Sequence, residues 1–364
     1  MVFSASVGAG HDGVTQELAR RLRERGFLVD CLDVLDILGE RLRRALSEDY
    51  RRMLGSAPWI YDVLFAIAQS FRGAAPITRL LLRPMRSRLL RLLPSDTRAV
   101  VSAYPLASQI LGPLRRNGQL AVPAITYLTD FGVHPIWIAP GIDAHCAVHE
   151  VTRAQASALG GADVRVAGRL VSAGFEPGSP SARRRAREQL GLPPEGRLAL
   201  LVAGSWAVGD LAAAAADVAA TGVAVPVVVC AENEPLYRRL QRRCAGHVLG
   251  WVHDMPTLMH AVDVLVENAG GLTALEGMAC GLPVVTYRPI PGHGRLNAVT
   301  MAAAEVASWV RRREALRATL AEVIDGERGQ RQRDAGLALF ESDPAAVVAD
   351  IAKSMEPRST AGAE

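Results

Sequence analysis

The strongest constraint on the fold is an alternation of short apolar stretches with helical stretches, which occurs twice along the chain. In the first half, apolar runs predict strands at residues 2–6, 27–32, 99–103, 124–128 and 142–148. In the second half, they predict strands at residues 198–203, 225–230, 248–249, 262–267 and 283–287. Such alternation is typical of parallel sheets covered by helices. The sequence therefore predicts an α/β protein with two doubly wound, Rossmann-like domains that face a cleft, followed by C-terminal helices.

A stretch rich in helix-breaking residues separates the two halves. Residues 172–196 contain four prolines, four glycines and three consecutive arginines, and this composition indicates an interdomain linker. A chain of 364 residues is also long for a single core. We therefore predict an N-terminal domain at 1–175, a C-terminal domain at 176–355 and a disordered tail at 356–364.

Composition narrows the class of protein. The five cysteines are odd in number and form no CxxC pair, which indicates a reduced cytoplasmic protein without a cysteine-based zinc site. No apolar run reaches the ~18 residues of a membrane-spanning helix, and no secretory signal is evident. Basic charge is concentrated at residues 41–95, with eleven arginines against three acidic residues. That segment is expected to be mainly helical, with breaks at its prolines.

A glycine-rich turn follows the first predicted strand and opens the first predicted helix, 14–25, whose apolar positions are Val14, Leu18 and Leu22. It contains Gly8, Gly10 and His11, so backbone N–H groups at the helix start can approach a ligand closely. The spacing is not the dinucleotide fingerprint and the P-loop lysine is missing, which argues against a dehydrogenase or an NTPase. His11 is a candidate functional residue, and an N-terminal helix cap is the alternative interpretation.

A second polar segment, 129–137, follows the strand predicted at 124–128. Asp130 and His134 lie where parallel α/β sheets bind ligands, so both are candidate catalytic residues. Asp143 is close in sequence and could suggest a metal site, but no further ligand has a plausible spacing, so none is predicted. His145 and His149 are expected to be structural or exposed.

The strongest local signal follows the strand predicted at 262–267. Gly270 and Gly271 precede a helix, and their amides could hold a diphosphate at the positive helix end. Thr273 can add a hydroxyl, and Glu276, one turn further, is suited to accept hydrogen bonds from ribose. A simple glycine cap is disfavoured because a strand and a second glycine-rich turn, 289–298, follow directly.

Residues 270–298 resemble the donor-binding region of family 28 glycosyltransferases, above all monogalactosyldiacylglycerol synthases and processive diacylglycerol glucosyltransferases. The resemblance runs in order from about residue 1 to 345 and includes the segments 4–11, 129–137, 227–236 and 250–255. It implies a GT-B fold, with the acceptor-binding domain first and the nucleotide-sugar-binding domain second. It also implies inverting transfer without a metal, in which the UDP-sugar is a substrate and no cofactor is needed.

The resemblance also implies roles for particular residues. Glu276 would bind ribose, and His11 would act on the acceptor as base or positioning group, in an acceptor-side loop with Gly8 and Gly10. The nucleotide-sugar site would comprise Gly204, Ser205, Asn233, Trp251, Val252, Met255, Gly270, Gly271, Leu272, Thr273, Glu276, Pro291, Gly292, His293 and Asn297.

Three departures from the family pattern leave the donor sugar open. Related enzymes usually carry Gln-Glu where this chain has His293-Gly294, and a glycine pair or Gly-Arg where it has Ala231-Glu232. The turn around Trp206 is also bulkier than the expected glycine-rich loop. These changes are consistent with a different sugar or acceptor, or with lost activity.

The leading hypothesis is a hexosyltransferase that moves a sugar from a UDP-sugar to a hydroxyl of a lipid such as diacylglycerol. The alternatives are transfer to a soluble or secondary-metabolite acceptor, a UDP-sugar 2-epimerase, and a catalytically inactive nucleotide-sugar-binding homologue. The arginines and aromatic residues of 41–95 suggest an anionic membrane surface as partner, at the inner face of the plasma membrane. A packed leucine face with solvated arginines is the alternative, and no motif indicates nucleic-acid binding.

Overall fold

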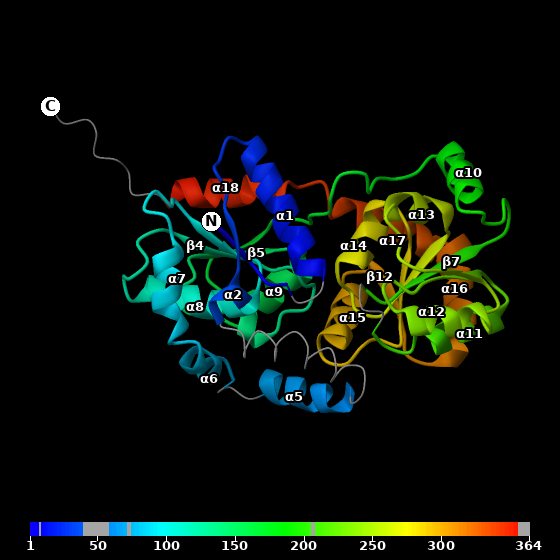
Figure 1. Cartoon of the computed structure of the whole chain (residues 1–364), viewed down its shortest axis with the longest axis horizontal. Helices are drawn as coiled ribbons and strands as arrows, with labels where there is room; N and C mark the ends of the chain where they lie inside the picture. The colour runs from blue at the N-terminus through cyan, green and yellow to red at the C-terminus, as the bar shows by residue number, and fades with distance from the viewer. Residues whose placement is uncertain (7–8, 39–57, 71–73, 205–207, 356–364) are drawn as a thin grey trace.

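A computed structural model describes residues 1–6, 9–38, 58–70, 74–204 and 208–355. Some side chains within these ranges, including that of His11, lie outside the description. The chain forms two α/β domains that lie side by side (Figure 1), each built on one sheet. This confirms the predicted fold class.

The first sheet has six parallel strands in the order β2-β1-β3-β4-β5-β6. Their bounds are β1 Val2–Ser4, β2 Cys31–Asp33, β3 Val100–Ser102, β4 Ala124–Tyr127, β5 Ala144–Ala147 and β6 Val164–Val166. The helical elements that accompany this sheet in sequence are α1 Ala9–Glu24, α2 Val34–Leu38, α5 Pro58–Ser70, α6 Ala74–Leu81, α7 Met85–Leu92, α8 Pro105–Arg116, η2 Pro135–Trp137 and α9 Glu150–Ala158.

The second sheet also has six parallel strands, in the order β12-β11-β10-β7-β8-β9. Their bounds are β7 Leu198–Val202, β8 Val225–Val229, β9 His247–Leu249, β10 Val264–Glu267, β11 Val284–Tyr287 and β12 Ala307–Val310. The remaining helical elements are α10 Pro180–Gln189, α11 Leu211–Thr221, α12 Glu234–Gln241, α13 Met255–Ala261, α14 Leu272–Ala279, α15 His293–Ala303, η3 Arg313–Ala315, α16 Leu316–Asp325, α17 Glu327–Ala338 and α18 Pro344–Ser354.

Strand β7 shows why the second sheet is parallel and covered on both faces. Leu198 and Leu200 belong to one buried cluster, whereas Ala199 and Leu201 belong to another. A strand buried on both sides must be apolar at every position, which is the pattern of a parallel sheet between two helical layers. The uninterrupted apolar run at 198–203 is therefore a direct consequence of the architecture.

Helix α1 has the predicted apolar face. Val14, Leu18 and Leu22 are all buried, as expected for residues one helical turn apart. The helix ends before Gly26, whose φ of +86° favours glycine at that position. The helix begins at Ala9, five residues before the predicted start, so the turn around Gly10 is already part of the helix.

The structure differs from the sequence-based description at sheet edges and domain boundaries. Strands β6 and β12 were not predicted, and both are the last strands of their sheets. The predicted linker at 172–196 contains helix α10, which packs against α13 of the second domain. The predicted range 176–355 contains helix α18, but this helix packs against α1 and β5 of the first domain (Figure 1). None of the described helices is long and apolar enough to cross a bilayer.

Helix α18 is attached to the first domain by an ion-paired end and a buried face. Asp343, which caps the helix by accepting a hydrogen bond from the N–H of Ala345, pairs with Arg25 at 2.5 Å and Arg21 at 3.6 Å. Val348 and Ile351 are buried, at 2% and 0% exposure. The first domain therefore includes a piece of chain from the far end of the sequence.

Replacing Ile351 with alanine should lower the free energy of unfolding by about 2–5 kcal/mol, because a fully buried side chain would leave a cavity. Urea unfolding measures the loss, and hydrogen exchange should locate it in β4 and β5. Asp350→Ala, on the exposed face of the same helix, is the control. Faster exchange confined to the second domain would contradict the attachment of α18 to the first.

Candidate active site between the two domains

The predicted donor-binding segments all lie at the carboxyl ends of the strands of the second sheet. They follow strands β7, β8, β9, β10 and β11, and because these strands are parallel, their carboxyl ends face the same way. Ligands of open α/β sheets bind at this edge. The sheet therefore brings together segments that are spread over about ninety residues of sequence.

The turn between β10 and α14 has the geometry of an anion-binding helix start. Gly271 is the N-cap of α14 and no side chain caps it. Gly270 has φ of +67°, and a Cβ there would lie 2.5 Å from the Cβ of Asn297. Only glycine fits this conformation and this space. The first amides of α14 are thus free of side-chain caps and carry the positive end of the helix dipole.

Glu276 is a half-buried residue of α14, one turn beyond Gly271. Burial raises the pKa of its carboxyl to about 8 from an ordinary value of 4.5. At neutral pH this carboxyl is therefore mainly in its protonated form, which can both donate and accept a hydrogen bond. Such a group suits a ribose hydroxyl and adds little negative charge beside a diphosphate.

Glu267, the last residue of β10, shapes the same turn and was not recognised from the sequence. Its carboxylate accepts hydrogen bonds from the N–H groups of Ala269 and Gly270 and from the hydroxyl of Thr286. Burial raises the pKa of Glu267, although these hydrogen bonds oppose that rise. The available signal was an acidic residue ending an otherwise apolar strand immediately before a glycine turn.

Asn297 of α15 joins the two domains through its side-chain amide. Its oxygen accepts a hydrogen bond from the N–H of Gly132 at 2.9 Å, and its nitrogen donates to the carbonyl of Ala269 at 3.0 Å. The same nitrogen lies 3.4 Å from a carboxylate oxygen of Asp130. The residue is only 1% exposed. Asn297 therefore lies in the predicted donor region but serves there to align a first-domain loop with the donor turn.

The two glycine-rich helix starts of the chain approach each other across the domain boundary. A Cβ at Gly13 of α1 would lie 2.7 Å from the Cδ2 of Leu272, the first residue of α14. Asp12 accepts a hydrogen bond from the hydroxyl of Ser4 at 2.5 Å. His11 lies in the first turn of α1, two residues before this contact. Residues 7–8 lie outside the described part of the chain, so Gly8 does as well.

The loop after β4 carries the other two predicted catalytic residues. A Cβ at Gly132 would lie 2.4 Å from Leu296, so the loop touches α15 closely. His134 caps η2 by accepting a hydrogen bond from the N–H of Ile136 at 3.2 Å, and its ring lies 4.6 Å from that of Phe65. Burial lowers the pKa of His134 to about 4. It is therefore neutral at physiological pH and a weak proton acceptor.

Arg169 supports this loop from beneath. It is 2% exposed and donates a hydrogen bond to the carbonyl of Thr129 at 2.6 Å. Its guanidinium lies 3.9 Å from the centre of the Phe131 ring, and burial lowers its pKa to about 9. The nearby charge of Asp130 opposes this fall in the pKa of Arg169.

The remaining predicted donor residues also follow the carboxyl ends of strands of the second sheet. Trp251, after β9, is 50% exposed, whereas Val252 and Met255 pack against the core. Asn233 caps α12 by accepting from the N–H of Leu236 at 3.1 Å. Of the other predicted positions, Gly204 is exposed with φ of +64°, Ser205 lies outside the described residues, and Pro291, Gly292 and His293 form the turn that opens α15.

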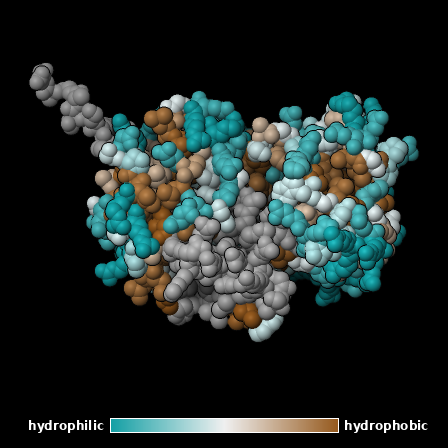
Figure 2. Space-filling model, viewed as in Figure 1, coloured by the Kyte–Doolittle hydropathy of each residue, from teal (hydrophilic) through white to brown (hydrophobic). Residues whose placement is uncertain are grey.

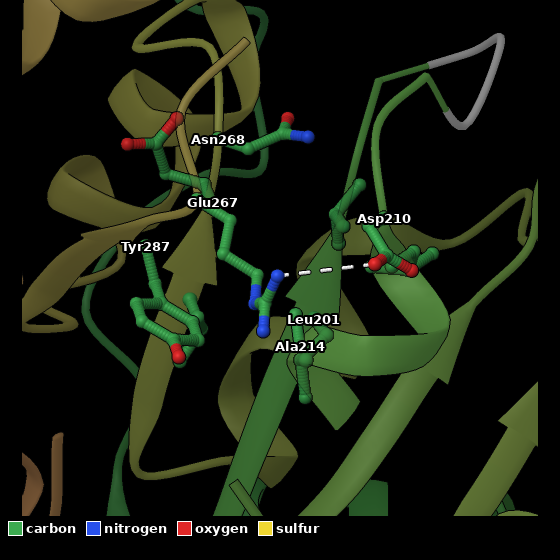
Figure 3. A pocket seen from close by; sticks show the side chains of 10 residues that line it. Leu201, Asp210, Ala214, Glu267, Asn268 and Tyr287 are labelled. Carbon is green, nitrogen blue, oxygen red and sulfur yellow. Dashed lines mark ion pairs between the residues drawn. The ribbon is translucent and has the colours of Figure 1, made fainter. Parts of the chain in front are cut away.

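A small hollow lies beside these turns, at the carboxyl ends of β7 and β10 (Figure 3). Its polar lining comprises Asp210, Glu267, Asn268, Tyr287 and Arg288. Arg288 pairs with Asp217 at 2.7 Å and lies 3.8 Å from Asp210, the pair dashed in Figure 3. The lining is thus held rigidly by ion pairs, next to the predicted donor turns.

The histidines and acids that might suggest a metal site have other partners. Asp143 pairs with Arg115 at 2.9 Å, His145 bonds the carbonyl of Ala162, and His149 caps α9. The expectation of structural roles for His145 and His149 is therefore confirmed. Over the described ranges, no three His, Cys, Asp or Glu side chains lie together as metal ligands would.

The raised pKa of Glu276 predicts a pH-dependent stability. Between about pH 4.5 and 8 the folded protein holds a proton that the unfolded chain has released, so stability falls as pH rises through this window. Glu276→Gln removes this titrating group. The unfolding midpoint of the variant minus that of the wild type should therefore increase as the pH is raised from 5 to 8.5. Glu314→Gln, at an exposed position of η3, is the control. A difference between the two midpoints that does not change with pH would contradict the raised pKa of Glu276.

Comparison with known proteins finds a glycosyltransferase family model for each half of the chain. The family model described as monogalactosyldiacylglycerol (MGDG) synthase matches residues 11–168, and that described as glycosyl transferases group 1 matches residues 201–318. The processive diacylglycerol beta-glucosyltransferase of Bacillus cytotoxicus is 24% identical, over 96% of this chain and 92% of that protein. The Bacillus subtilis enzyme of the same name is 25% identical, over 55% of this chain and 53% of that protein.

Solved structures support the fold. MurG of Acinetobacter baumannii is 18% identical with a TM-score of 0.58, over 98% of this chain and 99% of that one. A UDP-glucosyltransferase from Polygonum tinctorium is 16% identical with a TM-score of 0.61, over 97% of both chains. The chain is therefore a glycosyltransferase with the GT-B fold, similar in its first half to monogalactosyldiacylglycerol synthases and over most of its length to processive diacylglycerol glucosyltransferases.

Proposed function

We propose that this glycosyltransferase moves a hexose from a UDP-sugar to a hydroxyl of a lipid acceptor such as diacylglycerol. The observation that carries the proposal is the contact between the start of α1 and the start of α14, where Gly13 meets Leu272. It brings an acceptor-side glycine turn next to an uncapped helix start suited to a diphosphate. The lipid acceptor is suggested by the names of the related Bacillus enzymes.

The proposed reaction is an inverting displacement that uses no metal ion or cofactor. The acceptor oxygen attacks the anomeric carbon and transfers its proton to His11, while the bond from that carbon to the diphosphate breaks and UDP leaves. The amides at the start of α14, at Gly271 and Leu272, and the dipole of this helix stabilise the negative charge on the leaving group. The protonated carboxyl of Glu276 is available to the ribose hydroxyls.

We expect purified protein to release UDP from a UDP-hexose and to form a glycolipid when diacylglycerol is present. EDTA should leave the rate unchanged, and the product should have the opposite anomeric configuration to the donor. A panel of nucleotide sugars with lipid and soluble acceptors checks both statements. UDP release without a glycolipid would indicate a different acceptor, and binding without turnover would indicate an inactive homologue. A strict need for Mg²⁺ or Mn²⁺ would contradict the mechanism.

His11→Ala should lower turnover by about 10²-fold or more, the scale expected for the loss of a general base. The KM for the nucleotide sugar should change much less, because the donor is held by the other domain. Steady-state kinetics with a fixed lipid acceptor separate the two parameters. Turnover near the wild-type value would make Asp130 the better candidate for the base.

We further propose that the first domain binds an anionic membrane surface as a peripheral cytoplasmic protein. Ile77, Leu80 and Leu81 of α6 are 49%, 65% and 71% exposed. Figure 2 shows hydrophobic surface at the lower left, on the domain that carries α6, and at the lower edge near α5. Exposed apolar side chains at this density are typical of an interaction surface. Residues 39–57 of the basic segment lie outside the described part of the chain.

Four arginines of this domain form a cluster. Arg86 lies near Arg79, Arg83 and Arg116, and Arg79 also lies near Arg116. Among the described residues, no ion pair involves any of the four. Burial and the neighbouring arginines lower the pKa of the Arg86 guanidinium, which indicates uncompensated positive charge. Lipid phosphates would supply the missing negative charge beside an apolar anchor.

The double variant Arg83→Gln, Arg86→Gln should weaken binding to anionic vesicles by about 10-fold or more, taking ~1 kcal/mol per basic residue. Leu80→Ser should weaken binding to every vesicle. Co-sedimentation with anionic and neutral vesicles at low and high salt measures both effects. The exposed pair Arg242→Gln, Arg243→Gln on the second domain is the charge-matched control. Binding of the wild-type protein that does not depend on lipid charge or salt would exclude an electrostatic contribution to membrane binding.

A further inference from the structure

Helix α5 belongs to the first domain but reaches the donor side of the second. In Figure 1 it lies along the lower edge of the molecule, near α15. Trp59 and Val63 on its outer face are 68% and 50% exposed. Phe65 contacts the ring of His134 on its inner face. Asp62, which lies between these two faces by helical spacing, makes the contact with α15.

Asp62 caps a helix of the other domain. One carboxylate oxygen accepts a hydrogen bond from the N–H of Gly292 at 2.8 Å, and the other pairs with Arg295 at 2.5 Å. Gly292 is the N-cap of α15, with φ of +65°, and as a glycine it has no side chain for capping. Charge-assisted bonds to both a backbone amide and a guanidinium hold the turn strongly. Asp62 is one-quarter exposed, so the pair is partly shielded from water.

The turn that Asp62 holds is tied to the donor turn after β10. The N–H of Ile290 donates to the carbonyl of Asn268 at 2.8 Å. A Cβ at Gly294 would lie 2.6 Å from Ile290 and 3.0 Å from that same carbonyl, so the two turns are packed without spare room. A shift of the turn at 290–292 therefore moves Asn268 and, through it, the amides of Gly270 and Gly271.

We infer that Asp62 is a positioning residue for the nucleotide sugar, supplied to the donor site by the acceptor domain. This inference rests on the proposed function. Its consequence is that the donor turns reach their binding geometry only while α5 is docked across the domain boundary. Asp62 acts through the turn at 290–292 and needs no contact with the substrate.

The test compares variants that remove the two contacts separately. Asp62→Asn keeps an oxygen that can accept from Gly292 and loses the ion pair, Arg295→Gln loses the ion pair alone, and Asp62→Ala loses both contacts. Asp96→Asn, an exposed position in the same domain, is the charge-matched control. For each variant, kcat and the KM values for UDP-sugar and acceptor are measured, together with UDP affinity by calorimetry and the unfolding midpoint.

We expect Asp62→Ala to raise the KM for UDP-sugar about 10-fold, with kcat at saturating donor and the acceptor KM within about 2-fold of wild type. Asp62→Asn and Arg295→Gln should each raise the KM for UDP-sugar about 3-fold. Their combination should raise it no further, because both variants remove the same ion pair. Asp62→Glu should recover part of the loss. If Asp62→Ala does not fold, Asp62→Asn and Arg295→Gln decide.

An unchanged donor KM and UDP affinity in an active Asp62→Asn, Arg295→Gln double variant would overturn the inference and leave the proposed function intact. A uniform fall in kcat with a lowered unfolding midpoint, and no change in donor KM, would also overturn it, as a purely structural contact. Wild-type protein that neither binds UDP nor transfers sugar would instead overturn the proposed function, and the inference with it.

Discussion

The alignment of the two domains depends on the buried amide of Asn297. It satisfies the N–H of Gly132 from one domain and the carbonyl of Ala269 from the other, groups that would otherwise be buried unpaired. Because Ala269 directly precedes the predicted donor glycines and Gly132 follows Asp130, one side chain sets the distance between the two halves of the candidate site. Gly13 and Gly132 permit this approach, since each faces a leucine of the other domain where a Cβ has no room.

Electrostatics at the predicted donor turn depend on two glutamates near the start of α14. Burial raises the pKa of Glu276 to about 8, so this carboxyl contributes little negative charge at neutral pH. Burial also raises the pKa of Glu267, but its carboxyl accepts hydrogen bonds from Ala269, Gly270 and Thr286, which oppose that rise. The positive end of the α14 dipole therefore meets little opposition from Glu276.

Central strands and glycine turns were predictable, whereas edges and cross-domain contacts were not. Strands such as β7 and β10 are buried on both faces and therefore appear as apolar runs. Strands β6 and β12 lie at sheet edges, and β6 has exposed Arg165 at its centre, so no apolar run marks it. Asp62 and Asn297 act on partners 167 to 230 residues away, and no local pattern indicates such a partner. Asn297, which was predicted to belong to the nucleotide-sugar site, nevertheless lies next to the predicted donor turn.

Helix α18 returns from the end of the chain to complete the core of the first domain. The first domain is consequently discontinuous in sequence, although the second is nearly continuous. A chimera that exchanges first domains between relatives by joining segments near residue 175 would pair a foreign α18 with the new core. Recombination that preserves the fold must therefore carry the last helix together with the N-terminal half, which makes the second domain an insertion within the first.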